Sequence, residues 1–176
     1  MTTAKYAVSV LGAGSYGTAL AICLARNNHA IGLWGRDANH IETLAKDRAN
    51  ERYLPGASFP ESLQLESDIQ TVVSQSETIL LVVPSHAFSQ TLLSIKPFLI
   101  PGSKVAWATK GLEPDTGRLL QDVAREILGS DISLAVISGP TFAKEMAMGL
   151  PTAISVSSTD SLFVKQLSDY LHCGRS

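Results

Sequence analysis

Residues 8–17 are VSVLGAGSYG, a short apolar run followed by three glycines in the spacing Gly-x-Gly-x-x-Gly. The apolar and β-branched residues from Tyr6 to Leu11 predict a strand that is buried on both faces. From Tyr16 onward, closely spaced apolar residues and alanines predict a helix with a broad apolar face. The glycines therefore lie between a strand and a helix, which is the context in which a glycine-rich turn binds a dinucleotide.

Each glycine of this turn has its own predicted role. Gly12 permits the tight turn, Gly14 lets the backbone approach a pyrophosphate, and Gly17 lets the helix pack close to the sheet. The free N–H groups at the start of the helix, around Ser15 and Tyr16, then face the negative charge, so that no cationic side chain is needed there.

Strand and helix patterns alternate along the rest of the chain. Further strands are predicted at residues 30–34, 63–65, 78–83, 105–109, 134–138 and 153–156. Further helices are predicted after a cap at Asp37 or Asn39, and near residues 69–73, 89–98, 117–128, 142–148 and 160–171, with a loop at 49–60. This order predicts an α/β fold of the Rossmann type: a doubly wound, mostly parallel sheet with helices on both faces.

Two details of this pattern can be checked directly. The strand at 78–83 is the most apolar and is expected at the centre of the sheet. The helix at 117–128 is expected to place Leu119, Leu120, Val123 and Ile127 on one apolar face.

Composition and charge limit the size and the partners of the chain. Its 176 residues suffice for one domain, and 45% hydrophobic with 17% charged residues is typical of a globular protein. A net charge of −2 offers no electrostatic footprint for nucleic acid. No stretch is long enough for a membrane span, no signal peptide is evident, and Cys23 and Cys173 form no Cys-x-x-Cys pair. We therefore expect a cytoplasmic protein with reduced thiols.

Two other classes of protein also use glycine-rich turns. A protein kinase loop joins two strands and requires later His-Arg-Asp and Asp-Phe-Gly segments, which this sequence lacks. A Rossmann-type methyltransferase is the nearer alternative, and the end of the second strand does little to separate it from a dehydrogenase.

That strand ends in Trp34-Gly35-Arg36-Asp37, where the dinucleotide fingerprint expects an acid for the ribose 2′-hydroxyl. The Arg36 guanidinium can pair with a 2′-phosphate or stack on adenine, so we expect NADPH to be accepted. Asp37 leaves NADH possible, and the alternative for Arg36 is an ordinary solvated surface arginine.

Ligands of open α/β sheets bind beyond the carboxyl ends of the strands, so polar residues there are candidates for chemistry. Lys110 follows an apolar strand and would place an ammonium where nicotinamide and a substrate oxygen could meet. Gly139 allows close backbone approach, and Thr141 offers a hydroxyl. Their ordinary alternatives are a surface lysine and a helix cap. His86 also follows a strand, but we assign it no catalytic role, and no metal-ligand spacing is present.

Several segments together resemble the N-terminal domain of bacterial NAD(P)-dependent glycerol-3-phosphate dehydrogenases. They are residues 8–21 (VSVLGAGSYGTALA), 33–37 (LWGRD), 50–55 (NERYLP), 82–85 (VVPS), 109–113 (TKGLE), 138–145 (SGPTFAKE) and 151–153 (PTA). The first is shared by many dehydrogenases, whereas the combination of the last three is far more specific to this family.

The resemblance implies reversible reduction of dihydroxyacetone phosphate to sn-glycerol 3-phosphate with NADH or NADPH, which supplies glycerophospholipid synthesis. It implies dinucleotide contacts at Ser15, Tyr16, Arg36, Tyr53, Lys110 and Ala143, and substrate contacts at Lys110, Gly139 and Thr141. The family has a helical C-terminal domain that carries the acid/base lysine, and we expect that domain, and hence every catalytic acid/base group, to lie outside this chain.

Three hypotheses remain open from the sequence. The chain is the cofactor-binding half of such an enzyme, inactive by itself and part of a possible homodimer at full length. Alternatively, it belongs to a dehydrogenase of another small hydroxy acid or phosphorylated substrate, which fits residues 109–113 poorly. A third alternative is a dinucleotide sensor without chemistry, which would need neither Lys110 nor Thr141.

Overall fold

A seven-stranded sheet crosses the part of the chain that the computed structural model describes, residues 4–139 and 142–172. Its strands are β1 (Val8–Leu11), β2 (Ile31–Trp34), β3 (Leu63–Glu66), β4 (Thr78–Leu81), β5 (Lys104–Trp107), β6 (Ser133–Ser138) and β7 (Ser155–Ser158). They lie in the order β3-β2-β1-β4-β5-β6-β7, and every neighbouring pair is parallel except β6 and β7, which are antiparallel. The predicted doubly wound, mostly parallel sheet is confirmed, with β4 at its centre.

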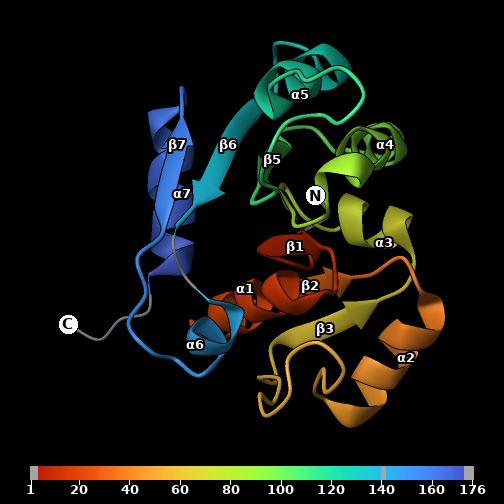
Figure 1. The fold of residues 1–176 in the computed structure, drawn as a ribbon, viewed down its shortest axis with the longest axis vertical. Coiled ribbons are helices and arrows are strands. Elements are labelled where there is room, and N and C mark those ends of the chain that lie inside the picture. Colours follow the sequence, from red (N-terminus) through yellow and green to blue (C-terminus); the bar gives the residue numbers. More distant parts are fainter. Residues whose placement is uncertain (1–3, 140–141, 173–176) are drawn as a thin grey trace.

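Helices cover both faces of this sheet (Figure 1). They are α1 (Ser15–Arg26), α2 (Ala38–Asp47), α3 (Ile69–Ser74), α4 (Ser85–Ile95), α5 (Leu120–Leu128), α6 (Ala143–Ala147) and α7 (Ser161–Leu171), with a 3-10 turn, η1, at Lys96–Phe98. The buried side chains form two clusters: α1, α2, α6 and α7 pack on one face, and α3, α4 and α5 on the other. This two-layer cover is why the central strands β1 and β4 are buried at every position.

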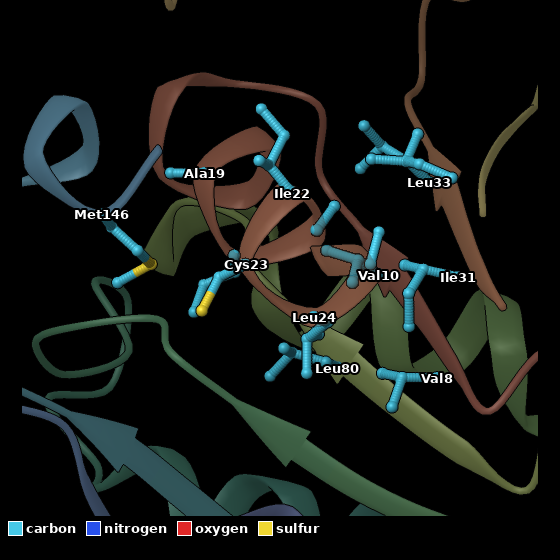
Figure 2. Close-up of a cluster of buried hydrophobic side chains, with 14 of the residues drawn as sticks. Val8, Val10, Ala19, Ile22, Cys23, Leu24, Ile31, Leu33, Leu80 and Met146 are labelled. Atoms are coloured by element: carbon cyan, nitrogen blue, oxygen red, sulfur yellow. The ribbon is translucent and has the colours of Figure 1, made fainter. Parts of the chain in front are cut away.

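Helix α1 is the centre of the first cluster. All nine of its residues from Gly17 to Ala25 are buried, because the sheet lies on one side and α6 on another. Figure 2 shows Met146 of α6 on one side of α1 and Val10 and Ile31 of the sheet on the other. The start of α1 is thereby packed over the end of β1.

The strand order reverses beside β1. The chain first builds β2 and β3 on one side of β1, and then returns to build β4, β5 and β6 on the other. Such a topological switch point leaves a crevice at the carboxyl ends of the two strands that flank it, and open α/β sheets bind ligands there. The glycine-rich turn directly follows β1 and lies at this point.

Several sequence-based boundaries were wrong, among them those of α4, α5 and β7, and the strands predicted at 78–83 and 105–109 end at Leu81 and Trp107. Helix α4 begins at Ser85 rather than Ser89, because Pro84 at its N-cap has the extended backbone from which a helix can start; His86 therefore lies in a first helical turn. Leu119 is the residue before α5 and is 51% exposed, so it is not part of the apolar face. Strand β7 begins two residues later than expected.

Candidate functional site

The register of the sheet aligns the ends of its strands. Leu11 of β1 lies opposite both Trp34 and Leu81, while Leu81 lies opposite Trp107 and Trp107 opposite Val136. These paired residues form a row across the sheet. The row contains the last residues of β1, β2, β4 and β5, and β6 runs two residues past it. The residues that follow the row thus lie along one edge of the sheet.

The predicted site residues follow this row closely. Gly14, Lys110 and Gly139 each lie three residues beyond the row on their own segments, and Arg36 lies two residues beyond it. Four positions that are far apart in the sequence therefore come to the same edge of the sheet, on both sides of the switch point. This shared edge is the candidate site.

One side of the glycine-rich turn is packed against backbone, and the other side is open. Gly12 has φ +127°, and a Cβ there would lie 2.1 Å from the carbonyl oxygen of Val82. A Cβ on Gly17 would lie 1.8 Å from the carbonyl oxygen of Gly12, so glycine lets α1 begin directly against the turn. A Cβ on Gly14 would meet no atom of the described residues within 4 Å. The open side is the side that a ligand can approach.

Gly17→Ala is expected to lower the free energy of unfolding by about 1–3 kcal/mol, the usual range for overpacking a rigid site. The added methyl group meets backbone rather than a movable side chain, so the turn or the helix must shift. Urea denaturation measures the change. Gly14→Ala is the matched control: its methyl group enters open space, so it should lose less than Gly17→Ala, at most the roughly 0.5–1 kcal/mol that alanine costs at an N-cap; equal losses in both variants would contradict the packing described here.

The start of α1 is available to an anion. Its N-cap, Gly14, makes no side-chain capping bond, and its first turn contains no acidic residue. Helix α2 differs: the Oδ1 atom of its N-cap, Asp37, accepts hydrogen bonds from the N–H groups of Asn39 at 3.0 Å and His40 at 3.3 Å. The first N–H groups of a helix carry partial positive charge, and those of α1 have no carboxylate cap. The turn therefore fits the pyrophosphate of a dinucleotide.

Tyr16, in the first turn of α1, is half-buried against the first hydrophobic cluster. Burial raises the pKa of its phenol, and the Cys23 thiol raises it further, so the hydroxyl stays neutral at ordinary pH. Ser15 beside it is exposed. The two residues offer hydroxyl groups and no charge to a ligand at the helix start.

Residues 49–60 fold back onto the glycine-rich turn. Asn50, which is completely buried, donates from Nδ2 to the Ala13 carbonyl oxygen at 3.1 Å and to the Thr18 Oγ1 atom at 2.9 Å. Its Oδ1 atom accepts a hydrogen bond from the Tyr53 N–H group at 3.3 Å. The segment that carries Tyr53 is thus bonded to both the turn and the helix.

Tyr53, within this segment, is 43% exposed. The His40 ring packs edge-on against it with centroids 5.3 Å apart, and the Arg52 guanidinium lies 5.0 Å from its centre. The His40 Nε2 atom is also 3.4 Å from the Ala13 carbonyl oxygen. Tyr53 therefore presents a partly open aromatic ring close to the turn.

A hydrogen bond from the neighbouring residue fixes the segment that carries Lys110. The side chain of Thr109 is buried and donates from Oγ1 to the Val83 carbonyl oxygen at 2.7 Å, which ties the end of β5 to the segment after β4. Lys110 itself is exposed, and Gly111 then turns the chain with φ +95°. The backbone of Lys110 is fixed at the sheet edge while its ammonium group remains in contact with solvent.

The remaining predicted residues lie beyond β6. A Cβ on Gly139 would lie 2.3 Å from the Ala153 carbonyl oxygen, so this glycine is required by the chain that leads into β7, a reason that the sequence did not reveal. Ala143 opens α6 and packs against the cluster around α1. Thr141, predicted to contact substrate, lies outside the described residues.

Sequence reasoning assigned no role to Asn50, His40 or Thr109. All three form hydrogen bonds to backbone carbonyl oxygens of segments distant in the sequence, which periodicity cannot reveal. The available signal was the presence of Asn50 and Thr109 in segments that carried the family resemblance.

Residues 4–139 and 142–172 contain no group of three or more histidine, cysteine or acidic side chains able to hold a metal ion. Within these same ranges, no helix combines the length and apolar character that crossing a membrane requires.

Comparison with known proteins places these features in a family. The family described as "NAD-dependent glycerol-3-phosphate dehydrogenase N-terminus" matches residues 7–164. A glycerol-3-phosphate dehydrogenase [NAD(P)+] from Pseudoalteromonas translucida is 66% identical over 176 residues, which are all of this chain and 52% of that protein. The chain thus spans about half the length of the curated relatives it matches.

Solved structures agree with this placement. The crystal structure of glycerol-3-phosphate dehydrogenase from Coxiella burnetii is 42% identical and has a TM-score of 0.91, covering 97% of this chain and 52% of that one. The glycerol-3-phosphate dehydrogenase structure from Plasmodium falciparum shares the fold, with a TM-score of 0.86 at 20% identity over 95% of this chain and 50% of that one. This chain therefore belongs to the family of N-terminal domains of NAD(P)-dependent glycerol-3-phosphate dehydrogenases.

Proposed function

We propose that residues 1–176 form the NAD(P)-binding domain of an enzyme that reduces dihydroxyacetone phosphate to sn-glycerol 3-phosphate, reversibly, as a step in making glycerophospholipid precursors. When bound, the dinucleotide supplies the hydride that the carbonyl carbon receives. The proton for the carbonyl oxygen would come from an acid outside this chain. The chain alone is expected to bind the dinucleotide with little or no turnover.

One observation carries this proposal: an open helix start and an exposed lysine lie on the same edge of the sheet, on either side of the switch point. A dinucleotide whose pyrophosphate lies at the start of α1 would extend along that edge in both directions. A dinucleotide sensor without chemistry would have no need of the lysine.

The proposed cofactor contacts come from the turn and from the residues on either side of it. The turn residues Gly12, Gly14, Ser15, Tyr16 and Gly17 would surround the pyrophosphate. On one side of the turn, Arg36 and Tyr53 would contact the adenosine part; on the other, Lys110 and Ala143 would lie along the nicotinamide part. The positions of Arg36 and Lys110 along the sheet edge and the family match support this assignment.

The substrate contacts would be Lys110, Gly139 and Thr141. An ammonium group beside the nicotinamide can hold the carbonyl or phosphate oxygens of a small phosphorylated ketone, and a backbone N–H or a hydroxyl can bond the rest. Lys110 and Gly139 follow the aligned ends of the neighbouring strands β5 and β6, which supports the assignments of these two residues. The third rests on the family match alone.

Arg36→Ala should weaken NADPH binding by about 10- to 100-fold and NADH binding much less. Arg36 is exposed at the end of β2, and only NADPH offers it a 2′-phosphate, for a charge-assisted hydrogen bond worth about 1.5–3 kcal/mol. Calorimetric titration with each cofactor measures the difference. Arg36→Lys keeps the charge and should retain part of the preference, whereas equal losses for both cofactors would indicate stacking on adenine instead.

Two experiments test the proposed function as a whole. NADPH should bind this chain, and the chain joined to the remaining half that its relatives carry should oxidise NADPH in the presence of dihydroxyacetone phosphate. Failure to bind NADPH would refute the cofactor assignment. Binding with turnover of a different hydroxy acid, and none of dihydroxyacetone phosphate, would refute only the substrate assignment.

We also propose that the full-length enzyme is a cytoplasmic homodimer. The small net charge of −2 and the absence of a Cys-x-x-Cys pair in the sequence are compatible with a cytoplasmic location. Light scattering of the full-length protein would measure its oligomeric state.

A further inference from the structure

Asn50 lies in a segment predicted to be a loop, yet its polar side chain is buried. It is completely buried, and both the nitrogen and the oxygen of its side-chain amide form hydrogen bonds. Nδ2 donates to the Ala13 carbonyl oxygen and to Thr18 Oγ1, while Oδ1 accepts from the Tyr53 N–H group. This orientation of the amide is the consistent one, because a carbonyl oxygen only accepts and a backbone N–H group only donates.

The bond to Ala13 fixes the direction of a peptide group in the glycine-rich turn. The described residues contain no cis peptide bond, so the amide between Ala13 and Gly14 is planar and trans, with its C=O and N–H groups pointing in opposite directions. Asn50 and His40 both lie on the carbonyl side. The Gly14 N–H group therefore points away from these two side chains.

The bond to Thr18 fixes the other side of the helix start. Thr18 is fully buried, and its N–H group makes the first helical hydrogen bond of α1, to the Gly14 carbonyl oxygen at 3.1 Å. One side chain therefore bonds the residue just before the N-cap of α1 and the residue that closes its first turn. The N–H groups available to an anion lie between these two points.

The third contact extends this arrangement to Tyr53. Besides the bond from the Tyr53 N–H group to Oδ1, the Leu54 N–H group donates to the Asn50 carbonyl oxygen at 2.8 Å. The backbone of the segment with the exposed tyrosine ring thus depends on the same residue as the turn.

We infer that Asn50 is a positioning residue for the dinucleotide: its buried amide holds the pyrophosphate-binding turn in its binding conformation and joins that turn to the segment of Tyr53. The inference rests on the proposed function, because it concerns how that site binds NADPH. Asn50 itself touches no part of the dinucleotide in this proposal and acts through the groups that it orients.

Substitution of Asn50 tests the inference by calorimetric titration with NADPH. Asn50→Asp keeps the size and the acceptor for Tyr53, but presents an oxygen to the Ala13 carbonyl oxygen. Asn50→Ser removes the bonds to Ala13 and Thr18 without adding charge. Each is expected to raise the Kd for NADPH about tenfold or more, the effect of losing a buried hydrogen-bond partner.

Asn27→Ala is the matched control. Asn27 lies at the opposite end of α1, and its Nδ2 atom donates to the Tyr170 carbonyl oxygen at 2.7 Å. This variant should lose thermal stability but keep its Kd for NADPH within about twofold, since a change at the far end of the helix is independent of a distant site. All titrations are made well below the melting temperature of each variant, which separates an effect on binding from one on stability.

The titrations of the Asn50 and Asn27 variants separate the inference from the proposed function. Weaker binding in both Asn50 variants with an unchanged Asn27→Ala supports the inference. Wild-type affinity in the Asn50 variants, or an equal loss in Asn27→Ala, overturns it. Failure of the unaltered chain to bind NADPH would instead refute the proposed cofactor function.

A second measurement needs no substitution. The side-chain amide of Asn50 should give a nuclear magnetic resonance signal that shifts when NADPH is added, because both the turn and the Tyr53 segment that it bonds would contact the ligand. The side-chain signal of Asn27 should stay in place. An Asn50 signal that does not move at saturating NADPH would overturn the inference even if no Asn50 variant folds.

Discussion

Gly14→Val is expected to fold as the unaltered chain does and to lose NADPH binding almost completely. Gly14 has φ −79° and ψ −164°, an extended conformation that valine adopts readily, and its Cβ would meet no described atom within 4 Å. The valine methyl groups would instead fill the space from which a pyrophosphate must reach the backbone N–H groups. Loss of two such hydrogen bonds, each worth about 1.5–3 kcal/mol, corresponds to about 10²- to 10⁴-fold in Kd.

Calorimetry and circular dichroism on the same preparations measure this effect. The dichroism spectrum and melting temperature should stay close to those of the unaltered chain, because the open side of the turn is where the side chain is added. Gly14→Ala, with a single methyl group, should bind with intermediate affinity. A valine variant that binds NADPH undiminished would show that the pyrophosphate does not lie at the start of α1.

Much of the fold could be predicted because its strongest signals are local. The four residues of β1 and of β4 are apolar or small and are buried throughout, and α1 follows a glycine pattern whose spacing has a direct steric cause. Alternation of such segments leaves few topologies for a parallel sheet.

The features that the sequence did not predict depend on contacts between distant segments. Leu119 is apolar but lies outside α5, in an isolated bridge with Leu112, so helical periodicity placed it wrongly. Nothing in the composition of residues 49–60 shows that Asn50 is buried against Ala13, because a polar residue in a segment with proline and glycine is usually exposed. The turn was predictable, whereas the groups that hold it were not.

Lys110→Met should lower kcat/KM for dihydroxyacetone phosphate by about 10²- to 10³-fold while most of the dinucleotide affinity remains. Removal of one preorganised electrostatic contact to a developing or fixed negative charge typically has an effect of this size. The hydrogen bond from Thr109 to Val83 fixes the backbone next to Lys110, and methionine keeps the length and the apolar stem of the side chain. The fold of the variant should therefore be unchanged.

The assay uses this chain joined to the half that its relatives carry, since the proposed acid lies there. Lys104→Met is the matched control: Lys104 begins the same strand, β5, at the amino edge of the sheet, so its loss should leave kcat/KM within about twofold. A Lys110 variant whose kcat/KM lies within a few-fold of the unaltered enzyme would place the substrate at another strand end. If NADPH affinity fell as steeply as kcat/KM, the ammonium group would serve the dinucleotide rather than the substrate, because a contact specific to substrate leaves the binary complex with the cofactor intact.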